Sequence, residues 1–312
     1  MDSKLHIKKI EIPEAARLIC VADLRGELRL FKRLLKEIDF GGDDILVILG
    51  NIYAKGKETL DFVMELAKFP NVHAVKGNID AEISEDIGEE RLNWLKSLPH
   101  IIESKNYIFV HAGLGPGKLE EQDPDTCMMT PAFFEKYDGP AFDKWVITGY
   151  WPVDFYCHEI PSHNPMVNRE KRIIAIDGGI GIRSAGQMNA FMIEKGKPSW
   201  QSVDGLGTVK IQDWQEGKPG TINIAFEDRF IEILEEGPEF SLVRHLESGK
   251  TLHVPTNKIW RQGGDICVND QATDHILTVR RGDTIAIVEE YSDRIYTKVE
   301  GEAGWIMAGE DN

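Results

Sequence analysis

The chain has 312 residues, of which 42% are hydrophobic and 28% are charged, and its formal net charge is −16. At about 150 residues per domain, this length predicts two domains, and the composition is ordinary for a globular protein. No apolar run approaches the roughly 20 residues that a membrane span needs, and the N-terminal stretch lacks the apolar region of a signal peptide. We therefore expect a cytoplasmic protein with no membrane partner. The acidic excess repels phosphate backbones, which argues against nucleic acid as a partner.

The four cysteines lie far apart in the sequence and include no CxxC pair. This spacing does not indicate a zinc site, and disulfides are not expected in a reducing compartment. We expect all four to be small buried hydrophobic residues: Cys20, Cys127, Cys157 and Cys267.

The first two hundred residues alternate short apolar runs with segments of helical periodicity. Strands are predicted at residues 17–22, 45–49, 72–75, 107–110, 145–148 and 172–176, and helices at residues 27–38, 59–68 and 89–97. Strands that alternate with helices favour an α/β fold with a largely parallel sheet covered on both faces.

Each of these strands ends in a polar turn that contains glycine. The six turns are ADLRG at 22–26, LGNIYAKG at 49–56, KGNID at 76–80, VHAG at 110–113, TGYWP at 148–152 and IDGG at 176–179. Glycine lets the backbone turn sharply, and ligand sites in open α/β sheets lie at the carboxyl ends of the strands. We therefore expect these turns to form the functional site.

This ordered series resembles the motifs of the calcineurin-like metallophosphoesterases over residues 15–195. The similarity is greatest to the branch of diadenosine tetraphosphatases and protein serine/threonine phosphatases, whose motifs are DxHG, GDxxDRG, GNH(E/D), HAG, GH and DGG. The resemblance implies the calcineurin-like phosphoesterase fold, an α/β fold of layered β-sheets flanked by helices. It also implies two divalent metals that share a carboxylate and activate water for attack on phosphorus, with a histidine that protonates the leaving oxygen.

Three of the six metal-ligand positions implied by the resemblance keep a suitable residue, namely Asp23, Asn78 and His111. Carboxylate, amide oxygen and imidazole are legitimate ligands, so we expect at most one weakly bound divalent metal, which would be Mn, Fe or Zn. Structural roles remain open for all three. Asp23 would pair with Arg25 or cap the following helix, His111 would be a hydrogen-bonded strand-end histidine, and Asn78 would suit a tight turn.

The other three ligand positions hold residues that do not suit paired metals. Arg25 replaces a histidine, Asn51 replaces the bridging aspartate, and Tyr150 replaces a second histidine. A guanidinium has no lone pair to donate, and two cations without a shared carboxylate repel each other. At an effective dielectric of about 20, a pair of unit charges 4 Å apart costs about 4 kcal/mol. We predict a degraded site without a paired metal cofactor.

The catalytic positions of the family are altered as well. Ile79 stands at the general-acid position, so no catalytic residue is predicted, and Ala54 replaces the carboxylate partner of that acid. Lys55 takes the place of the phosphate-binding arginine, and together with Arg25 it is a candidate anion-binding residue. Two acidic positions of the motifs are kept, namely Asp80 and Asp177.

The sequence changes in character after residue 193. Residues 194–220 are rich in Gly, Lys, Gln and Asp and predict a linker or an irregular connection. A faint internal repeat follows. Its paired segments are 230–236 with 284–290, 240–245 with 294–299, and 252–255 with 304–307. Two copies of about 45 residues favour two small β-barrels, which resemble bacterial SH3-like domains, and one irregular β-domain is the alternative.

The domain prediction is a metallophosphoesterase-like domain at 1–200, a linker at 201–219, and SH3-like barrels at 220–260 and 261–312. The favoured function is a pseudophosphatase that binds a phosphate-containing small molecule in its cleft or a protein partner through its tail. The alternatives are a residual metal-dependent phosphoesterase that acts on phosphoproteins or dinucleoside polyphosphates, and a structural scaffold.

Overall fold

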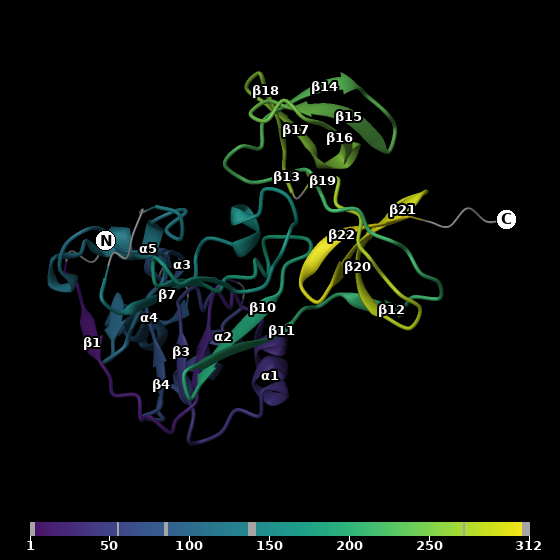
Figure 1. Cartoon of the computed structure of the whole chain (residues 1–312). Coiled ribbons are helices and arrows are strands. Elements are labelled where there is room, and N and C mark those ends of the chain that lie inside the picture. The colour runs from purple at the N-terminus through teal and green to yellow at the C-terminus, as the bar shows by residue number, and fades with distance from the viewer. Residues whose placement is uncertain (1–3, 55, 84–86, 137–141, 271, 308–312) are drawn as a thin grey trace. The chain divides into compact units, whose positions relative to one another are not determined.

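The computed structural model describes residues 4–54, 56–83, 87–136, 142–270 and 272–307 (Figure 1). The chain divides into two compact units. The first unit comprises Met1–Val153, Asn164–Gly181 and Gln187–Asp204, and the second comprises Asp154–His163, Ile182–Gly186 and Gly205–Asn312. None of the described helices is long and apolar enough to cross a membrane.

The first unit contains two mixed β-sheets. The six-stranded sheet, in the order β1-β5-β6-β7-β9-β8, consists of β1 (Ile7–Lys9), β5 (Ile101–Glu103), β6 (Tyr107–Val110), β7 (Trp145–Thr148), β8 (Met166–Asn168) and β9 (Ile173–Ala175). The five-stranded sheet, in the order β11-β10-β2-β3-β4, consists of β2 (Leu18–Val21), β3 (Ile45–Ile48), β4 (Val72–Ala74), β10 (Met188–Glu194) and β11 (Lys197–Val203). In each sheet three neighbouring strands are parallel, namely β2-β3-β4 and β6-β7-β9.

Apolar side chains of the two sheets meet in one core. Leu18, Val47 and Phe191 of the five-stranded sheet and Phe109 and Ile147 of the six-stranded sheet are at most 2% exposed and belong to the same cluster. The strands of this core read as continuous apolar runs because both of their faces are buried.

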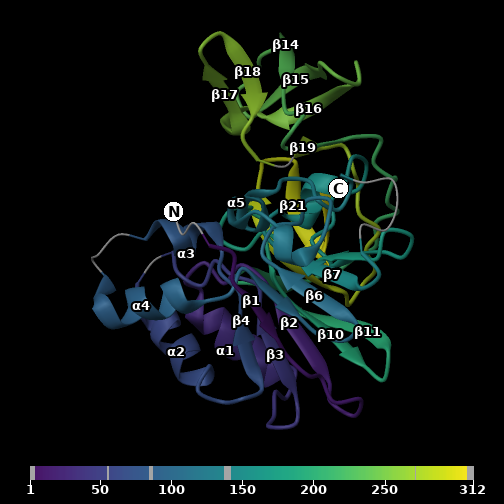
Figure 2. The same ribbon diagram turned by 90° about the vertical axis from the view of Figure 1, so that its left-hand side faces the viewer.

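Helices cover the other face of the five-stranded sheet. A second core joins alternate residues of β2 and β3 to α1 (Leu28–Glu37), α2 (Glu58–Leu66) and α4 (Glu89–Ser97), which lie on one side of these strands (Figure 2). The first unit also contains α3 (Asn78–Glu82), α5 (Pro124–Met129) and the 3₁₀ turn η2 (Leu119–Glu121). The 3₁₀ turn η3 (Val153–Tyr156) begins in the first unit and continues in the second.

The predicted strands and helices of residues 17–176 are confirmed to within three residues at each end. The expectation of a largely parallel sheet covered on both faces is wrong, since the structure has two mixed sheets packed face to face. An apolar run predicts a buried strand but not the sheet to which it belongs. The layered sheets that the family resemblance implied are the arrangement found.

The second unit is made of short antiparallel strands. Its four-stranded sheet, in the order β12-β20-β21-β22, consists of β12 (Gly207–Lys210), β20 (Thr284–Glu290), β21 (Arg294–Val299) and β22 (Glu302–Met307). Its three-stranded sheet consists of β14 (Ile231–Glu235), β15 (Phe240–His245) and β16 (Thr251–Pro255). The other elements are the pairs β13 (Asn223–Ile224) with β19 (Ala272–Thr273) and β17 (Ile259–Gln262) with β18 (Asp265–Val268), and the 3₁₀ turn η4 (Thr256–Lys258).

The segment predicted as a linker contains regular structure. β11 extends to residue 203 and β12 pairs with β20, so the prediction of an irregular connection is wrong for these two strands. Residues 211–220 contain only isolated β-bridges. All four residues of β12 and most of β11 are exposed, which explains why these strands lack the apolar alternation that would reveal them. In addition, β17 crosses the predicted boundary at residues 260 and 261.

The internal repeat has a counterpart in the backbone. The pairing of β14 with β15 shifts register between Ile233 and Glu235, and the pairing of β20 with β21 shifts between Ile287 and Glu289. These are equivalent positions of the two repeat copies, and a β-bulge at the same point bends both hairpins alike. The β-rich unit is compatible with SH3-like parts, and that resemblance stays a prediction.

Candidate functional site

The six polar turns follow β2, β3 and β4 of one sheet and β6, β7 and β9 of the other. Four of their non-glycine residues have left-handed backbones, with φ of 54° at Asp23, 43° at Arg25, 49° at Asn51 and 66° at Tyr150. Such conformations cost of order 1 kcal/mol each and persist only where the surroundings fix them. The contacts described next supply that constraint.

Asp23 is fully buried and both of its carboxylate oxygens accept hydrogen bonds. Oδ1 accepts from Arg25 Nη2 and Asn51 Nδ2, both at 2.9 Å, and Oδ2 accepts from the backbone N–H of Tyr150 at 2.9 Å. Its predicted pairing with Arg25 is confirmed. The alternative of a helix cap is wrong, because the residue at the N-cap of α1 is Glu27.

Arg25 lies between two buried carboxylates. Its guanidinium donates to Asp177 in two places, Nη1 to Oδ1 at 3.2 Å and Nη2 to Oδ2 at 2.7 Å, and also to the carbonyl oxygen of Ile180 at 2.9 Å. Burial by itself would lower the pKa of Arg25, but the attraction of Asp177 and Asp23 outweighs burial and raises that pKa. Burial raises the pKa of the Asp177 carboxyl, which Arg25 offsets only in part. The guanidinium is therefore permanently charged inside the protein. The formal charges of Arg25, Asp23 and Asp177 together sum to −1.

Asn51, predicted to take the place of a bridging carboxylate, has an amide whose orientation is fixed from both sides. Its Oδ1 accepts from the backbone N–H of Ile79 at 3.0 Å, so the Nδ2 group points to Asp23. The two turns approach so closely here that a Cβ on Gly77 would lie 2.4 Å from Asn51 Oδ1. Asn51 thus presents a hydrogen-bond donor, not a lone pair, to the carboxylate.

His111 and Asn78 face each other next to this network. The His111 ring is buried, and its Nδ1 lies 2.6 Å from the carbonyl oxygen of Leu49, which can only accept, so Nδ1 carries the proton. Its Nε2 lies 3.1 Å from Asn78 Oδ1, and its ring packs edge-on against Tyr150 at 5.5 Å. The expectation of a hydrogen-bonded histidine at a strand end is confirmed.

Asp80 has a structural role that the sequence did not reveal. Its Oδ1 accepts from the backbone N–H groups of Ile52 and Tyr53 at 3.0 and 3.3 Å, and its Oδ2 accepts from Gly77 at 3.1 Å. Burial raises the pKa of this carboxyl. Asp80 therefore ties the turn after β3 to the turn after β4.

The other positions that the sequence singled out lie at less buried places in the turns. Ile79, Ala54 and Tyr150 are half-buried, and burial followed by the charge of Asp23 raises the pKa of the Tyr150 phenol. Lys55, predicted to bind anions, lies outside the described residues. The sequence also failed to reveal Asp177 as the main partner of Arg25. An arginine within a set of acidic motifs was the available signal, because a buried cation needs carboxylate partners.

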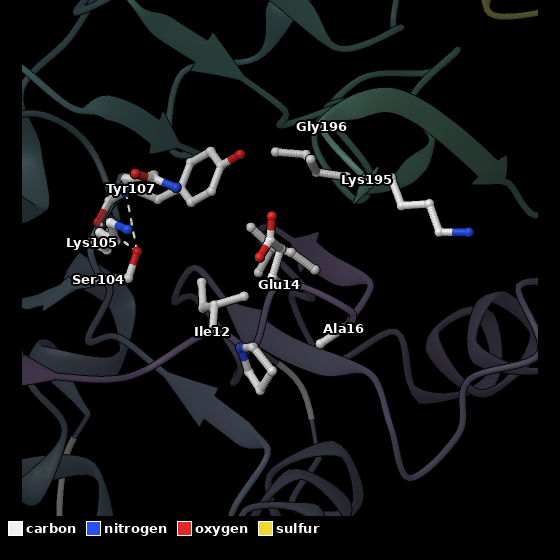
Figure 3. Close-up of a pocket in the computed structure, with 12 residues that line it drawn as sticks. Ile12, Glu14, Ala16, Ser104, Lys105, Tyr107, Lys195 and Gly196 are labelled. Carbon is white, nitrogen blue, oxygen red and sulfur yellow. Dashed lines mark hydrogen bonds between the residues drawn. The ribbon is translucent and has the colours of Figure 1, made fainter.

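No three His, Cys, Asp or Glu side chains in the described ranges are arranged to hold a metal ion. A separate hollow of about 700 Å³ opens in the first unit, near the starts of β2 and β6 (Figure 3). Glu14 points into it beside Tyr107, and none of the residues of the six turns lines it. The hollow therefore lies away from the candidate site.

Comparisons with known proteins agree with this architecture. A model of the calcineurin-like phosphoesterases matches residues 16–180, more than half of the chain. A symmetrical bis(5'-nucleosyl)-tetraphosphatase from Chromobacterium violaceum is 28% identical over 121 residues, which make up 32% of this chain and 44% of that protein. The chain thus spans less than half the length of this curated relative.

A solved structure with a TM-score above 0.5 supports this fold. A protein described as a candidate diadenosine tetraphosphatase matches with a TM-score of 0.51 and 19% identity, over 64% of this chain and 99% of that one. A protein serine/threonine phosphatase from Saccharomyces cerevisiae matches with a TM-score of 0.47 and 10% identity, over 65% of this chain and 85% of that one. Together with the six ordered turns, the family match shows that this chain belongs to the calcineurin-like metallophosphoesterases.

Proposed function

We propose that this protein is a non-hydrolytic member of its family, a pseudophosphatase whose phosphoesterase-like unit serves binding or scaffolding. The observation that carries the proposal is the Arg25 guanidinium, which donates to Asp23 at 2.9 Å and to Asp177 at 2.7 Å. Two-metal hydrolysis needs cations a few ångströms apart with oxygen ligands free to coordinate them. Here an internal cation already pairs with both carboxylates.

Paired metal ions do not fit these residues. Both oxygens of Asp23 already accept hydrogen bonds, Oδ1 from Arg25 and the amide of Asn51, and Oδ2 from the backbone N–H of Tyr150. A dication bound at Asp23 within about 4 Å of the guanidinium would be repelled by about 8 kcal/mol at an effective dielectric of about 20. No other anion among the site residues described above replaces the missing bridging carboxylate.

A single weak metal at Asp23, Asn78 and His111 is the basis of the second candidate function, a residual phosphoesterase. Asn78 Oδ1 and His111 Nε2 are 3.1 Å apart and face each other, which favours this candidate. Asp23 weakens it, because its carboxylate would have to give up hydrogen bonds to reach a metal. The names of the relatives give dinucleoside tetraphosphates as the substrate to test.

Phosphate binding at Arg25 receives less support than a protein partner. The donors of Arg25 engage Asp177, Asp23 and the Ile180 carbonyl, and the local charge is negative without any ligand. An incoming phosphate would meet two carboxylates. We therefore place binding of a protein partner, or a scaffolding role, ahead of phosphate recognition.

The test measures turnover of p-nitrophenyl phosphate and diadenosine tetraphosphate with manganese. We expect no turnover by the wild-type protein above that of Asp23→Ala and His111→Ala. The combined variant Arg25→His, Asn51→Asp and Tyr150→His restores the family's ligand types and should gain bound metal. Wild-type turnover that both alanine variants abolish would establish the residual enzyme and refute the proposal.

A further inference from the structure

A row of large apolar side chains crosses four neighbouring segments of the second unit. The backbone N–H of Leu246 donates to the carbonyl oxygen of Phe230 at 3.0 Å, Phe230 bridges to Cys267, and Cys267 pairs with Trp260. Paired residues of adjacent antiparallel strands lie about 4.5 to 5.5 Å apart on the same face. Leu246, Phe230, Cys267 and Trp260 therefore form one continuous line, which we call the apolar row.

The apolar row lies on the outer face of these strands. Ile231 and Val268, the sequence neighbours of Phe230 and Cys267, are buried in the core of this part of the unit, and successive strand residues point to opposite faces. Leu246 is 58% exposed, Trp260 45% and Phe230 41%, whereas Cys267, between Phe230 and Trp260, is only 5% exposed. The strands that carry the row, β14, β15, β17 and β18, lie together in both views (Figures 1 and 2).

The border of the apolar row is acidic. Glu247 follows Leu246 directly, Asp265 lies two residues before Cys267 on the same face, and neither is in an ion pair with any residue that the structure describes. Two nearby arginines are already paired, Arg244 with Glu232 at 2.6 Å and Arg261 with Glu236 at 3.0 Å. Arg229, which directly precedes Phe230, lies over the Phe226 ring at 4.4 Å. The row is thus bordered by two acidic side chains without an ion pair among the described residues and by one arginine that stacks on an aromatic ring.

We propose that the apolar row docks a segment of another protein that presents apolar side chains flanked by Lys and Arg. This deepens the proposed function, since it assigns the surface and the partner chemistry of the protein-binding role. Contiguous exposed apolar side chains mark interaction sites, and Trp and other aromatic residues dominate binding energy at such sites. The acidic border selects basic partners.

A second copy of this chain is a poor occupant by the same argument. Two acidic borders would face each other, and the whole chain carries a net charge of −16. Like charges brought together at an interface disfavour association. The negative charge of the chain therefore favours a basic partner over self-association.

The experiment uses the full chain and two labelled synthetic helical peptides as probes. Both peptides present a leucine face, with Lys on the other face of the first peptide and Glu on that of the second. We expect the leucine–lysine peptide to bind with a Kd below about 1 mM, measured by fluorescence anisotropy, and the leucine–glutamate peptide not to bind. Trp260→Ser and Phe230→Ser should each weaken binding about tenfold or more.

Matched variants separate docking from nonspecific attraction and from misfolding. Trp214→Ser removes a side chain that is 68% exposed in the same unit, next to Gln215, which bridges to Val279 and not to the apolar row. It should leave binding unchanged, whereas Asp265→Lys should weaken it. Circular dichroism melting curves confirm that each variant is folded.

Equal binding of the two peptides, or equal binding by wild type and Trp260→Ser, would overturn the docking proposal. Sedimentation that shows a dimer dissociated by Trp260→Ser would overturn it in favour of a second copy. Neither result bears on hydrolysis, which is measured separately with phosphoester substrates. Failure of the docking proposal is thus distinguishable from failure of the pseudophosphatase proposal.

Discussion

Replacement of Arg25 by alanine removes the cation that pairs with both Asp23 and Asp177. The two carboxylates are 0% and 1% exposed, so the variant leaves buried negative charges without a partner. Loss of one partner from a buried ion pair destabilises a protein by about 3 to 5 kcal/mol. Since natural domains have free energies of unfolding of about 5 to 15 kcal/mol, Arg25→Ala should lose a large fraction of the stability of the first unit.

The assay is urea unfolding followed by circular dichroism and tryptophan fluorescence. Arg33→Ala is the matched control, because Arg33 forms an exposed i,i+4 pair with Glu37. Such pairs contribute only about 0.3 to 0.5 kcal/mol. A loss below about 1 kcal/mol for Arg25→Ala would show that the ion pair does not hold the site together.

The pH dependence of Arg25→Ala supplies an independent check. Burial already raises the pKa of Asp177, and removal of Arg25 takes away the charge that opposes this increase. A carboxyl with a raised pKa in the folded state binds a proton more tightly there than in the unfolded state, so stability falls as pH rises through that pKa. The destabilisation by Arg25→Ala should therefore be smaller at acidic pH than at neutral pH. A difference that does not change with pH would contradict this explanation.

Two further predictions concern the first unit. Gly77→Ala should destabilise it by about 1 to 3 kcal/mol in urea unfolding, because the new Cβ would lie 2.4 Å from Asn51 atoms, and an unchanged midpoint would contradict this close approach. Burial and the charge of Lys8 lower the pKa of His73 from 6.5 to about 4, so the unfolded chain takes up this proton first and stability falls as pH drops from 6.5 toward 4. With solvent screening allowed for, the free energy of unfolding falls by about 1 to 2 kcal/mol over this pH range. The variant His73→Leu should lack this decrease. An equal decrease in the stability of both proteins between pH 6.5 and 4 would contradict this assignment.

The sequence predicts strands well where apolar runs are buried on both faces. Residues 107–110 and 145–148 match β6 and β7. The period of the apolar pattern is enough for such elements, because burial forces the composition of the strand. The apolar pattern did not reveal β12, whose residues are all exposed. It also did not reveal how the strands divide between two sheets.

The candidate site was predictable residue by residue but not as a network. The motifs bring Asp23, Arg25 and Asn51 together, and the pairing of Asp23 with Arg25 was among the expectations. The two-point contact of Arg25 with Asp177 joins residues 152 positions apart, and spacing alone does not identify such a partner. The role of Asp80, which joins the turns after β3 and β4 through their backbone N–H groups, was also missed. In sequence, a carboxylate that accepts from backbone N–H groups looks the same as one that binds a metal.

The internal repeat is faint in the sequence but has a counterpart in the strand pairing. The two copies share apolar alternation, and the structure adds a register shift at equivalent positions after Ile233 and Ile287. A bulge leaves no direct mark in the sequence, so its recurrence is independent support for the repeat.

Arg25 and Asn51 should exclude paired metal ions from this site. Elemental analysis by mass spectrometry, after incubation with manganese and removal of free metal, measures this exclusion. We expect the wild-type chain to retain no stoichiometric manganese, whereas Arg25→His combined with Asn51→Asp and Tyr150→His should retain it. Two manganese ions per wild-type chain, lost in Asp23→Ala, would show that Arg25 and Asn51 do not exclude them.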